Sequence, residues 1–111
     1  SSCTPRREMA LAFLALSEDE KRHARDLAAA IYLITGKAYC PRVCVEQPDT
    51  CDLCALLRSL YHAEACAGYN YARAGEETLD LCLSKLFAAM SEDEYRHAEL
   101  LMKLLGRKMN V

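Results

Sequence analysis

Apolar residues recur with the period of an α-helix in three long segments of the chain. In the first segment, alternating steps of four and three residues connect apolar side chains with two ionisable ones. These positions are Met9, Phe13, Leu16, Glu20, His23, Leu27, Ala30 and Ile34. Because such steps stay on one face of a helix, they predict a core-facing seam with Glu20 and His23 at its middle.

The same stepping defines a seam in each of the other two segments. The second seam consists of Leu53, Leu57, Leu60, Glu64, Ala67, Tyr71 and Ala74. The third seam consists of Leu83, Phe87, Met90, Glu94, His97, Leu101 and Leu104. No alternating run rich in β-branched residues competes with these patterns. We therefore expect an all-α fold of three long helices.

Start and stop signals set the expected limits of the first helix and the segment after it. Thr4 and Pro5 are typical of a helix start, and Gly36 supplies a stop, so this helix should have about thirty residues. A loop containing two prolines follows, after which Asp49 or Thr50 can cap the second helix.

Glycines set the expected ends of the other two helices. The second helix should end at Gly75. The third should run from about Glu76 to Leu105 and stop at Gly106. We assign the cysteine-rich crossover loop to residues 37–54, a range that includes the expected beginning of the second helix.

Composition limits the class of protein. The chain has 111 residues with 14 basic and 16 acidic side chains, which fits a single domain over residues 1–111 without the basic surface that nucleic acid requires. Its longest uncharged apolar runs, Met9–Leu16 and Leu27–Ile34, are far shorter than a membrane span. Seven cysteines cannot all pair within one chain, and no signal-like segment precedes the first helix. We therefore expect a cytoplasmic protein that binds neither nucleic acid nor membrane.

An internal repeat relates the first and third segments. Residues 13–24 read FLALSEDEKRHA and residues 87–98 read FAAMSEDEYRHA, at a constant offset of 74. The repeated unit is most simply a helix hairpin whose second member carries this motif. The helix with Glu64 completes the second hairpin, whereas its counterpart in the first would lie upstream of Ser1. We therefore expect a fold of the ferritin-like four-helix-bundle type whose fourth helix is missing or is supplied by a partner chain, most simply a second copy in a homodimer.

The repeat contains the ionisable residues that could bind a metal ion. Burying an unpaired carboxylate is expensive, so ionisable groups within apolar seams must pair, protonate or bind a cation. The Glu-x-x-His spacing places both side chains on one helix face, where one ion can take an oxygen and a nitrogen ligand. Two such motifs can hold two ions, and a glutamate from another helix can complete the set. Mixed oxygen and imidazole ligands indicate iron or manganese.

At these positions the chain resembles the ferritin-like superfamily, in particular the small di-iron proteins of the rubrerythrin type. The residues that carry the resemblance are Glu20, His23, Glu64, Glu94 and His97. The resemblance implies two iron or manganese ions, a redox reaction of a di-ferrous site with O2 or peroxide, and an electron-donor protein. It also assigns Tyr71 to the place of a tyrosine beside the metal pair. The chain differs in lacking a rubredoxin module and in having Ala67 where rubrerythrins carry a further glutamate.

Two other interpretations of the repeat remain open at this stage. The Ser-x-x-Glu spacing at Ser17 and Ser91 also fits a capping box, which would place both motifs at helix starts. Alternatively, glutamate and histidine could pair with each other inside a metal-free bundle. The first interpretation predicts exposed motifs and the second predicts buried ones.

Four cysteines are clustered before and at the start of the second helix. They are Cys40, Cys44, Cys51 and Cys54, of which the last two have metal-clip spacing. Four thiolates there could hold zinc or iron, whereas disulfides or free thiols would only brace the crossover. The alternative function is accordingly a non-catalytic helical interaction module with a structural zinc site.

Overall fold

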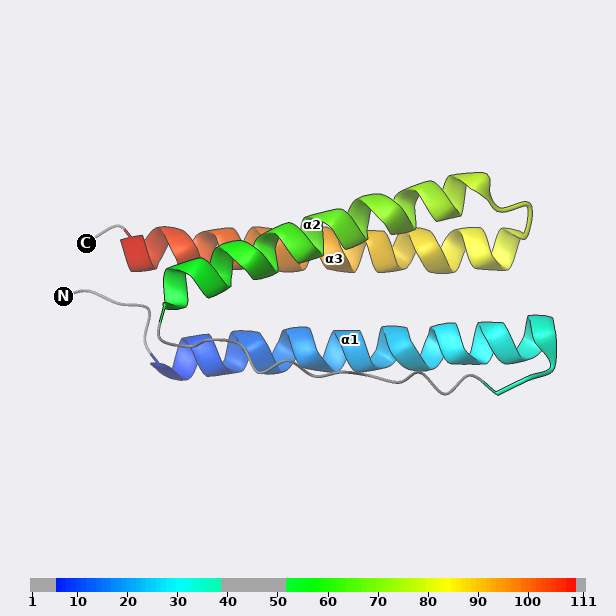
Figure 1. Ribbon diagram of the computed structural model, residues 1–111, viewed down its shortest axis with the longest axis horizontal. Helices are drawn as coiled ribbons and strands as arrows, with labels where there is room; N and C mark the ends of the chain where they lie inside the picture. The colour runs from blue at the N-terminus through cyan, green and yellow to red at the C-terminus, as the bar shows by residue number, and fades with distance from the viewer. Residues whose placement is uncertain (1–5, 39–51, 110–111) are drawn as a thin grey trace.

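The computed structural model describes residues 6–38 and 52–109. These residues form three helices: α1 (Arg6–Thr35), α2 (Leu53–Glu77) and α3 (Leu81–Met109) (Figure 1). The described ranges contain no strand. The expected all-α fold of three long helices is therefore confirmed, while Thr4, Pro5 and the expected caps at Asp49 and Thr50 lie outside the described residues.

The three helices have unequal neighbours. α2 and α3 form an antiparallel hairpin, and α1 lies beside α3, with its chain running in the same direction as α2 (Figure 1). Within the described residues, no Cα atom of α1 comes within 8 Å of one in α2. The two helices therefore meet only through side chains, such as His23 and Tyr71, and α1 has an open side, where Glu20 and Ala24 are exposed.

The first helix ends as expected, whereas the second begins later than expected. Gly36 has a φ of 70° and donates its N–H to the carbonyl of Tyr32, so it stops α1 in the left-handed conformation that glycine favours. Asp52 caps α2, because its side chain accepts a hydrogen bond of 3.0 Å from the N–H of Ala55. Cys54 consequently lies in the first turn of α2 rather than in the crossover loop.

The expected helix ends at Gly75 and Gly106 are wrong. α2 continues through Gly75 to Glu77, and α3 continues through Gly106 to Met109. The beginning of α3 is set by Asp80, whose carboxylate accepts a hydrogen bond of 3.0 Å from the N–H of Leu83. A glycine stops a helix only where the chain leaves the helical conformation, and neither position does so.

Two glycines of α2 instead allow close contact with α3. Ser91 Oγ donates a hydrogen bond of 2.7 Å to the carbonyl of Gly68, and Ser84 Oγ donates one of 2.8 Å to the carbonyl of Gly75. A Cβ added at Gly75 would lie 3.2 Å from the carbonyl oxygen of Ser84. The two contacts are seven residues apart on each helix, so they fix the antiparallel register of the hairpin.

Apolar residues from all three helices pack at one end of the seams. The buried cluster consists of Ala12, Leu16, Leu57, Leu101 and Leu104. The other end of α1 is much less covered, and Ile34, expected in the seam, is 66% exposed. None of the described helices combines the length and apolarity needed to span a membrane.

Candidate metal centre

Four of the five expected ligand residues come together from the three helices. Glu20 on α1, Glu64 on α2, and Glu94 and His97 on α3 each offer one ligand atom, and these atoms all lie within 4.8 Å of one another. The fifth residue, His23, lies beside this group, with Nδ1 3.1 Å from Glu94 Oε1. We call the five residues the carboxylate cluster.

Glu94 and Glu20 lie between the two histidines. Glu94 Oε1 is 3.1 Å from His23 Nδ1 and 3.7 Å from His97 Nδ1. Glu20 Oε1 is 3.9 Å and 3.4 Å from the same two atoms. Glu64 Oε1 lies 3.5 Å from His97 Nδ1 and forms no such contact with His23 in the described structure. The His97 side therefore has one more carboxylate than the His23 side.

Each histidine is held by an aspartate from the opposite copy of the repeat. His23 Nε2 lies 2.8 Å from Asp93 Oδ2, and His97 Nε2 lies 2.6 Å from Asp19 Oδ2. An ionised carboxylate only accepts hydrogen bonds, so Nε2 carries the proton and Nδ1 presents its lone pair to the carboxylate cluster. The repeat relates the two contacts, because His23 corresponds to His97 and Asp93 corresponds to Asp19. The pair formed by α1 and α3 therefore has an internal two-fold relationship.

Neither aspartate was among the residues predicted from the sequence. The signal was available, because an aspartate precedes the glutamate in both copies of the repeat, at positions 19 and 93. Periodicity alone assigns these positions to the edge of the seam. Their role depends on the antiparallel packing of α1 against α3, which the sequence does not specify directly.

Arginines keep Asp93 ionised. Arg22 donates from Nη2 to Asp93 Oδ2 at 2.6 Å, and Arg96 also donates to this carboxylate. Burial favours the neutral carboxyl group, but the hydrogen bond from His23 and the charges of both arginines outweigh it. The pKa of Asp93 consequently lies below its ordinary value. Asp93 thus remains an acceptor for the proton on His23.

Three buried atoms of the cluster have no hydrogen-bond partner. They are His23 Nδ1, His97 Nδ1 and Glu94 Oε1. Buried polar atoms are nearly always satisfied, so a group of unsatisfied acceptors indicates a missing positive partner. Burial, followed by the proximity of Glu64 and Glu20, raises the pKa of Glu94 to about 10. Without a metal, a protonated Glu94 can satisfy only one of the two histidine nitrogens, whereas a divalent cation fits the whole donor set.

The structure corrects two expectations about the repeat. The Ser-x-x-Glu motifs do not cap helices, because Ser17 and Ser91 lie in the interiors of α1 and α3. Glu20 is not buried like its counterpart Glu94: its side chain is 45% exposed, compared with 2% for Glu94. The difference arises because α2 packs closely on α3 at Glu94, whereas no described helix packs closely on α1 at Glu20.

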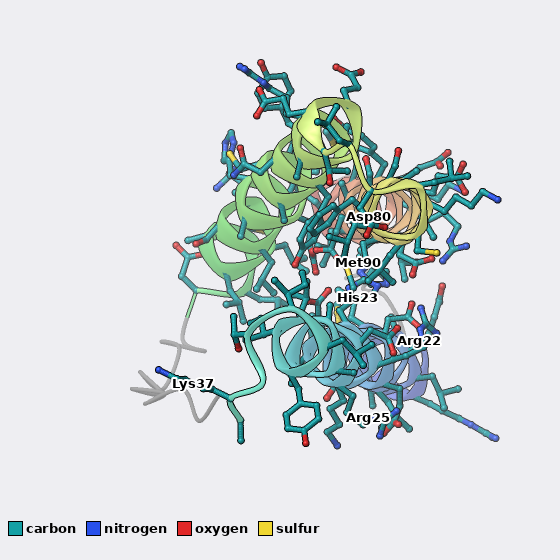
Figure 2. The ribbon with its side chains drawn as sticks, turned by 90° about the vertical axis from the view of Figure 1, so that its right-hand side faces the viewer. Arg22, His23, Arg25, Lys37, Asp80 and Met90 are labelled. Carbon is teal, nitrogen blue, oxygen red and sulfur yellow. The ribbon has the colours of Figure 1, made fainter. Side chains whose placement is uncertain are left out.

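Tyr71 lies on the His23 side of the cluster. Its ring meets the His23 ring edge to face, with centroids 6.2 Å apart, and stacks on Phe87 at 6.2 Å. Burial raises the pKa of Tyr71, and the nearby charges of the cluster raise it further. Figure 2 shows His23 and Met90 in the space between α1 and the α2–α3 pair, whereas Arg25 lies on the outer side of α1.

The expected cysteine site lies almost entirely outside the described residues. Cys40, Cys44 and Cys51 are not described, and Cys54 is a half-buried free thiol on α2. Zinc or iron binding by these cysteines therefore stays a prediction.

Comparison of the chain with models of known families, with curated proteins and with solved structures finds no match. No family is identified in this way. The candidate metal centre consequently rests on its own geometry: three glutamates and one histidine whose ligand atoms lie close together, with a second histidine beside them.

Proposed function

We propose that the protein is a di-metal carboxylate protein of the ferritin-like type that binds iron or manganese. The observation that carries this proposal is the group of three unpartnered buried atoms, His23 Nδ1, His97 Nδ1 and Glu94 Oε1. Both histidine nitrogens point to the same carboxylates and are held there by aspartates. Imidazoles oriented in this way by a carboxylate are typical of metal ligands, which supports the proposal.

The distances divide the ligands between two ions. His97 and Glu64 would hold one ion, and His23 would hold the other. Glu20 and Glu94 lie near both histidines and would be shared. Carboxylate and imidazole ligands suit iron and manganese, while the absence of thiolate from the cluster argues against structural zinc at this position.

The proposed reaction is redox chemistry with O2 or peroxide, of the ferroxidase or peroxidase type. When bound, iron supplies the electrons for that chemistry. The residues of the chain orient the ligands: Asp19 and Asp93 fix the two imidazoles, and the apolar cluster packs the helices beside the site. Tyr71 lies close enough to the carboxylates for their charge to raise its pKa, so its hydroxyl stays protonated. A separate electron-donor protein would restore the reduced state.

Metal analysis tests the proposal directly. The protein is loaded anaerobically with Fe²⁺ or Mn²⁺, separated from free metal and analysed for bound ions. We expect His97→Ala to lose at least about half of the bound metal, because removing one ligand weakens binding strongly. His62→Ala is the matched control, since this histidine of α2 is exposed and lies outside the cluster. Equal metal content in both variants would contradict the proposal.

Loaded protein is then mixed with O2 or with peroxide, and iron oxidation is followed by stopped-flow absorbance. We expect oxidation faster than that of the same iron in buffer and slower in His97→Ala than in His62→Ala. Binding without any protein-dependent oxidation would limit the function to metal storage or structure.

A further inference from the structure

Identical residues in the two copies of the repeat differ in burial. Ser91 and Ala98 on α3 are 6% and 5% exposed, whereas their counterparts Ser17 and Ala24 on α1 are exposed. Glu20 and Glu94 differ in the same sense. Ser17, Glu20 and Ala24 follow one another at helical spacing on α1. We call these three residues the open stripe.

Helix α2 accounts for the burial of the corresponding stripe on α3. The hydroxyl of Ser91 reaches the backbone carbonyl of Gly68, and Ala98 lies at the same surface hollow as Tyr61 and Ala65 of α2. No described helix covers the open stripe in this way, because no Cα atom of α2 comes within 8 Å of one in α1 (Figure 1). The same residues are thus covered by a helix in one copy and left open in the other.

The internal two-fold relationship indicates what would cover the open stripe. It already relates the His23–Asp93 contact to the His97–Asp19 contact, so it holds across the α1–α3 interface. The same operation applied to α2 places a helix on α1, antiparallel to it and on the open side of the molecule. That helix would meet Ser17 as α2 meets Ser91.

We propose that the open stripe is the docking surface for a partner helix that repeats the pattern of α2. This pattern is a glutamate followed by glycines four and eleven residues later, as at Glu64, Gly68 and Gly75. The nearer glycine brings a backbone carbonyl within reach of the Ser17 hydroxyl. The glutamate meets His23 as Glu64 meets His97, which supplies the carboxylate that the His23 side lacks.

The docking of the helix and the role of its glutamate can be contradicted separately. Docking rests only on the repeat and on the difference in burial. The role of the glutamate rests on the proposed metal centre. We therefore expect the chain alone to bind one ion tightly, on the His97 side, and the assembly with the partner helix to bind two.

A synthetic peptide with the sequence of residues 53–77 serves as the probe, and its binding to the full chain is measured by fluorescence anisotropy. We expect saturable binding, weakened at least about tenfold by Ala24→Arg, because a charge would be buried at the contact. Ala15→Arg is the matched control: Ala15 and its counterpart Ala89 are both exposed, so neither faces a helix. The control should change the affinity less than about twofold.

A variant with the helix covalently attached tests the same contact if the free peptide is too unfolded to bind. A copy of residues 53–79 replaces residues 1–5 ahead of Arg6, which reproduces the 30-residue spacing between Glu64 and Glu94. Tethering raises the effective concentration of the helix. We expect a higher Tm than with a flexible extension of equal length, and two bound Mn²⁺ per chain instead of one. Glu→Gln at the copied glutamate should keep the gain in Tm and lose the second ion.

The proposal is overturned if the peptide fails to bind and the tethered helix does not raise the Tm. It is also overturned if the unmodified chain sediments as a stable dimer that Ala24→Arg dissociates and Ala15→Arg does not, since a second copy would then occupy the stripe. A gain in Tm without any bound Mn²⁺ would support the docking surface and contradict the proposed metal centre.

Discussion

His23 on α1 and Asp93 on α3 are joined across the helix interface, with 2.8 Å between Nε2 and Oδ2. The contact does two things at once. It joins the two helices, and it turns the second imidazole nitrogen toward Glu94. Because His97 and Asp19 repeat the arrangement, the packing of α1 on α3 and the geometry of the carboxylate cluster are one feature of the molecule.

Asp93→Asn should weaken metal binding without unfolding the protein. The amide can present its nitrogen to the histidine and no longer fixes the proton on Nε2, so the affinity for Mn²⁺ should fall by about ten- to a hundredfold. Titration with Mn²⁺ followed by electron paramagnetic resonance measures the affinity. Glu92→Gln makes the same change at the neighbouring exposed position and should leave it unaltered. Equal affinities for the two variants would show that Asp93 only serves the helix interface.

The metal-free protein should lose stability as the pH rises. The pKa of Glu94 is about 10 in the folded chain because of burial and two neighbouring carboxylates, compared with 4.5 for a free glutamate. Between these values the unfolded chain loses its proton and the folded chain keeps it. The free energy of unfolding therefore falls through this window, by at most about 1.4 kcal/mol per pH unit for one proton. Urea denaturation in the presence of a chelator, at several pH values, measures the slope.

Glu94→Gln is the test of this assignment, because an amide cannot ionise and should remove most of the slope. Glu92→Gln should leave the slope intact. Saturating Mn²⁺ should reverse the trend, since the cation displaces the proton and binds more tightly as the pH rises. A metal-free protein whose stability rises between pH 5 and pH 8 would contradict the protonated state of Glu94.

The candidate ligand residues could be predicted because they combine two independent signals. Glu20, His23, Glu94 and His97 occupy seam positions and recur at a constant offset, and each signal is unaffected by the details of packing. Glu64 lacks a described repeat partner and was indicated by its seam alone. Its position beside His97 shows that three-four stepping was sufficient on α2 as well.

Features that depend on contacts between helices could not be predicted in this way. Glycine is typical of helix ends, yet the chain stays helical at Gly75. The glycine serves the packing instead, because the backbone of α3 leaves little room for a side chain there. The burial of Glu20 was overestimated for the opposite reason: a seam indicates which face turns inward, but not whether a neighbouring helix covers it. Both errors concern how closely another helix approaches, which the periodicity of a single segment does not show.

Gly75→Ala should destabilise the protein, although alanine is the better helix former. The added Cβ would lie 3.2 Å from a backbone carbonyl of α3, so this part of α3 must move away by a few tenths of an ångström, at a cost of about 1–3 kcal/mol. Gly106→Ala is the matched control, because Gly106 is also helical and has no other atom within 4 Å of the added Cβ. That variant should gain up to about 1 kcal/mol. Thermal unfolding of both variants by circular dichroism measures the difference, and equal effects would show that α2 and α3 are not held closely at Gly75.

Tyr71→Phe should slow the reaction while leaving the metal in place. The ring of Tyr71 meets that of His23 at 6.2 Å, on the side of the cluster that has fewer carboxylates, so phenylalanine preserves the packing and removes only the hydroxyl. We expect the affinity for Fe²⁺ to change less than about twofold and iron oxidation to slow by about tenfold or more, as befits loss of a proton or electron relay. Tyr69→Phe removes an exposed hydroxyl from the same helix and should change neither quantity. Stopped-flow absorbance with O2 and with peroxide gives the rates, and identical rates for the two variants would exclude Tyr71 from the redox step.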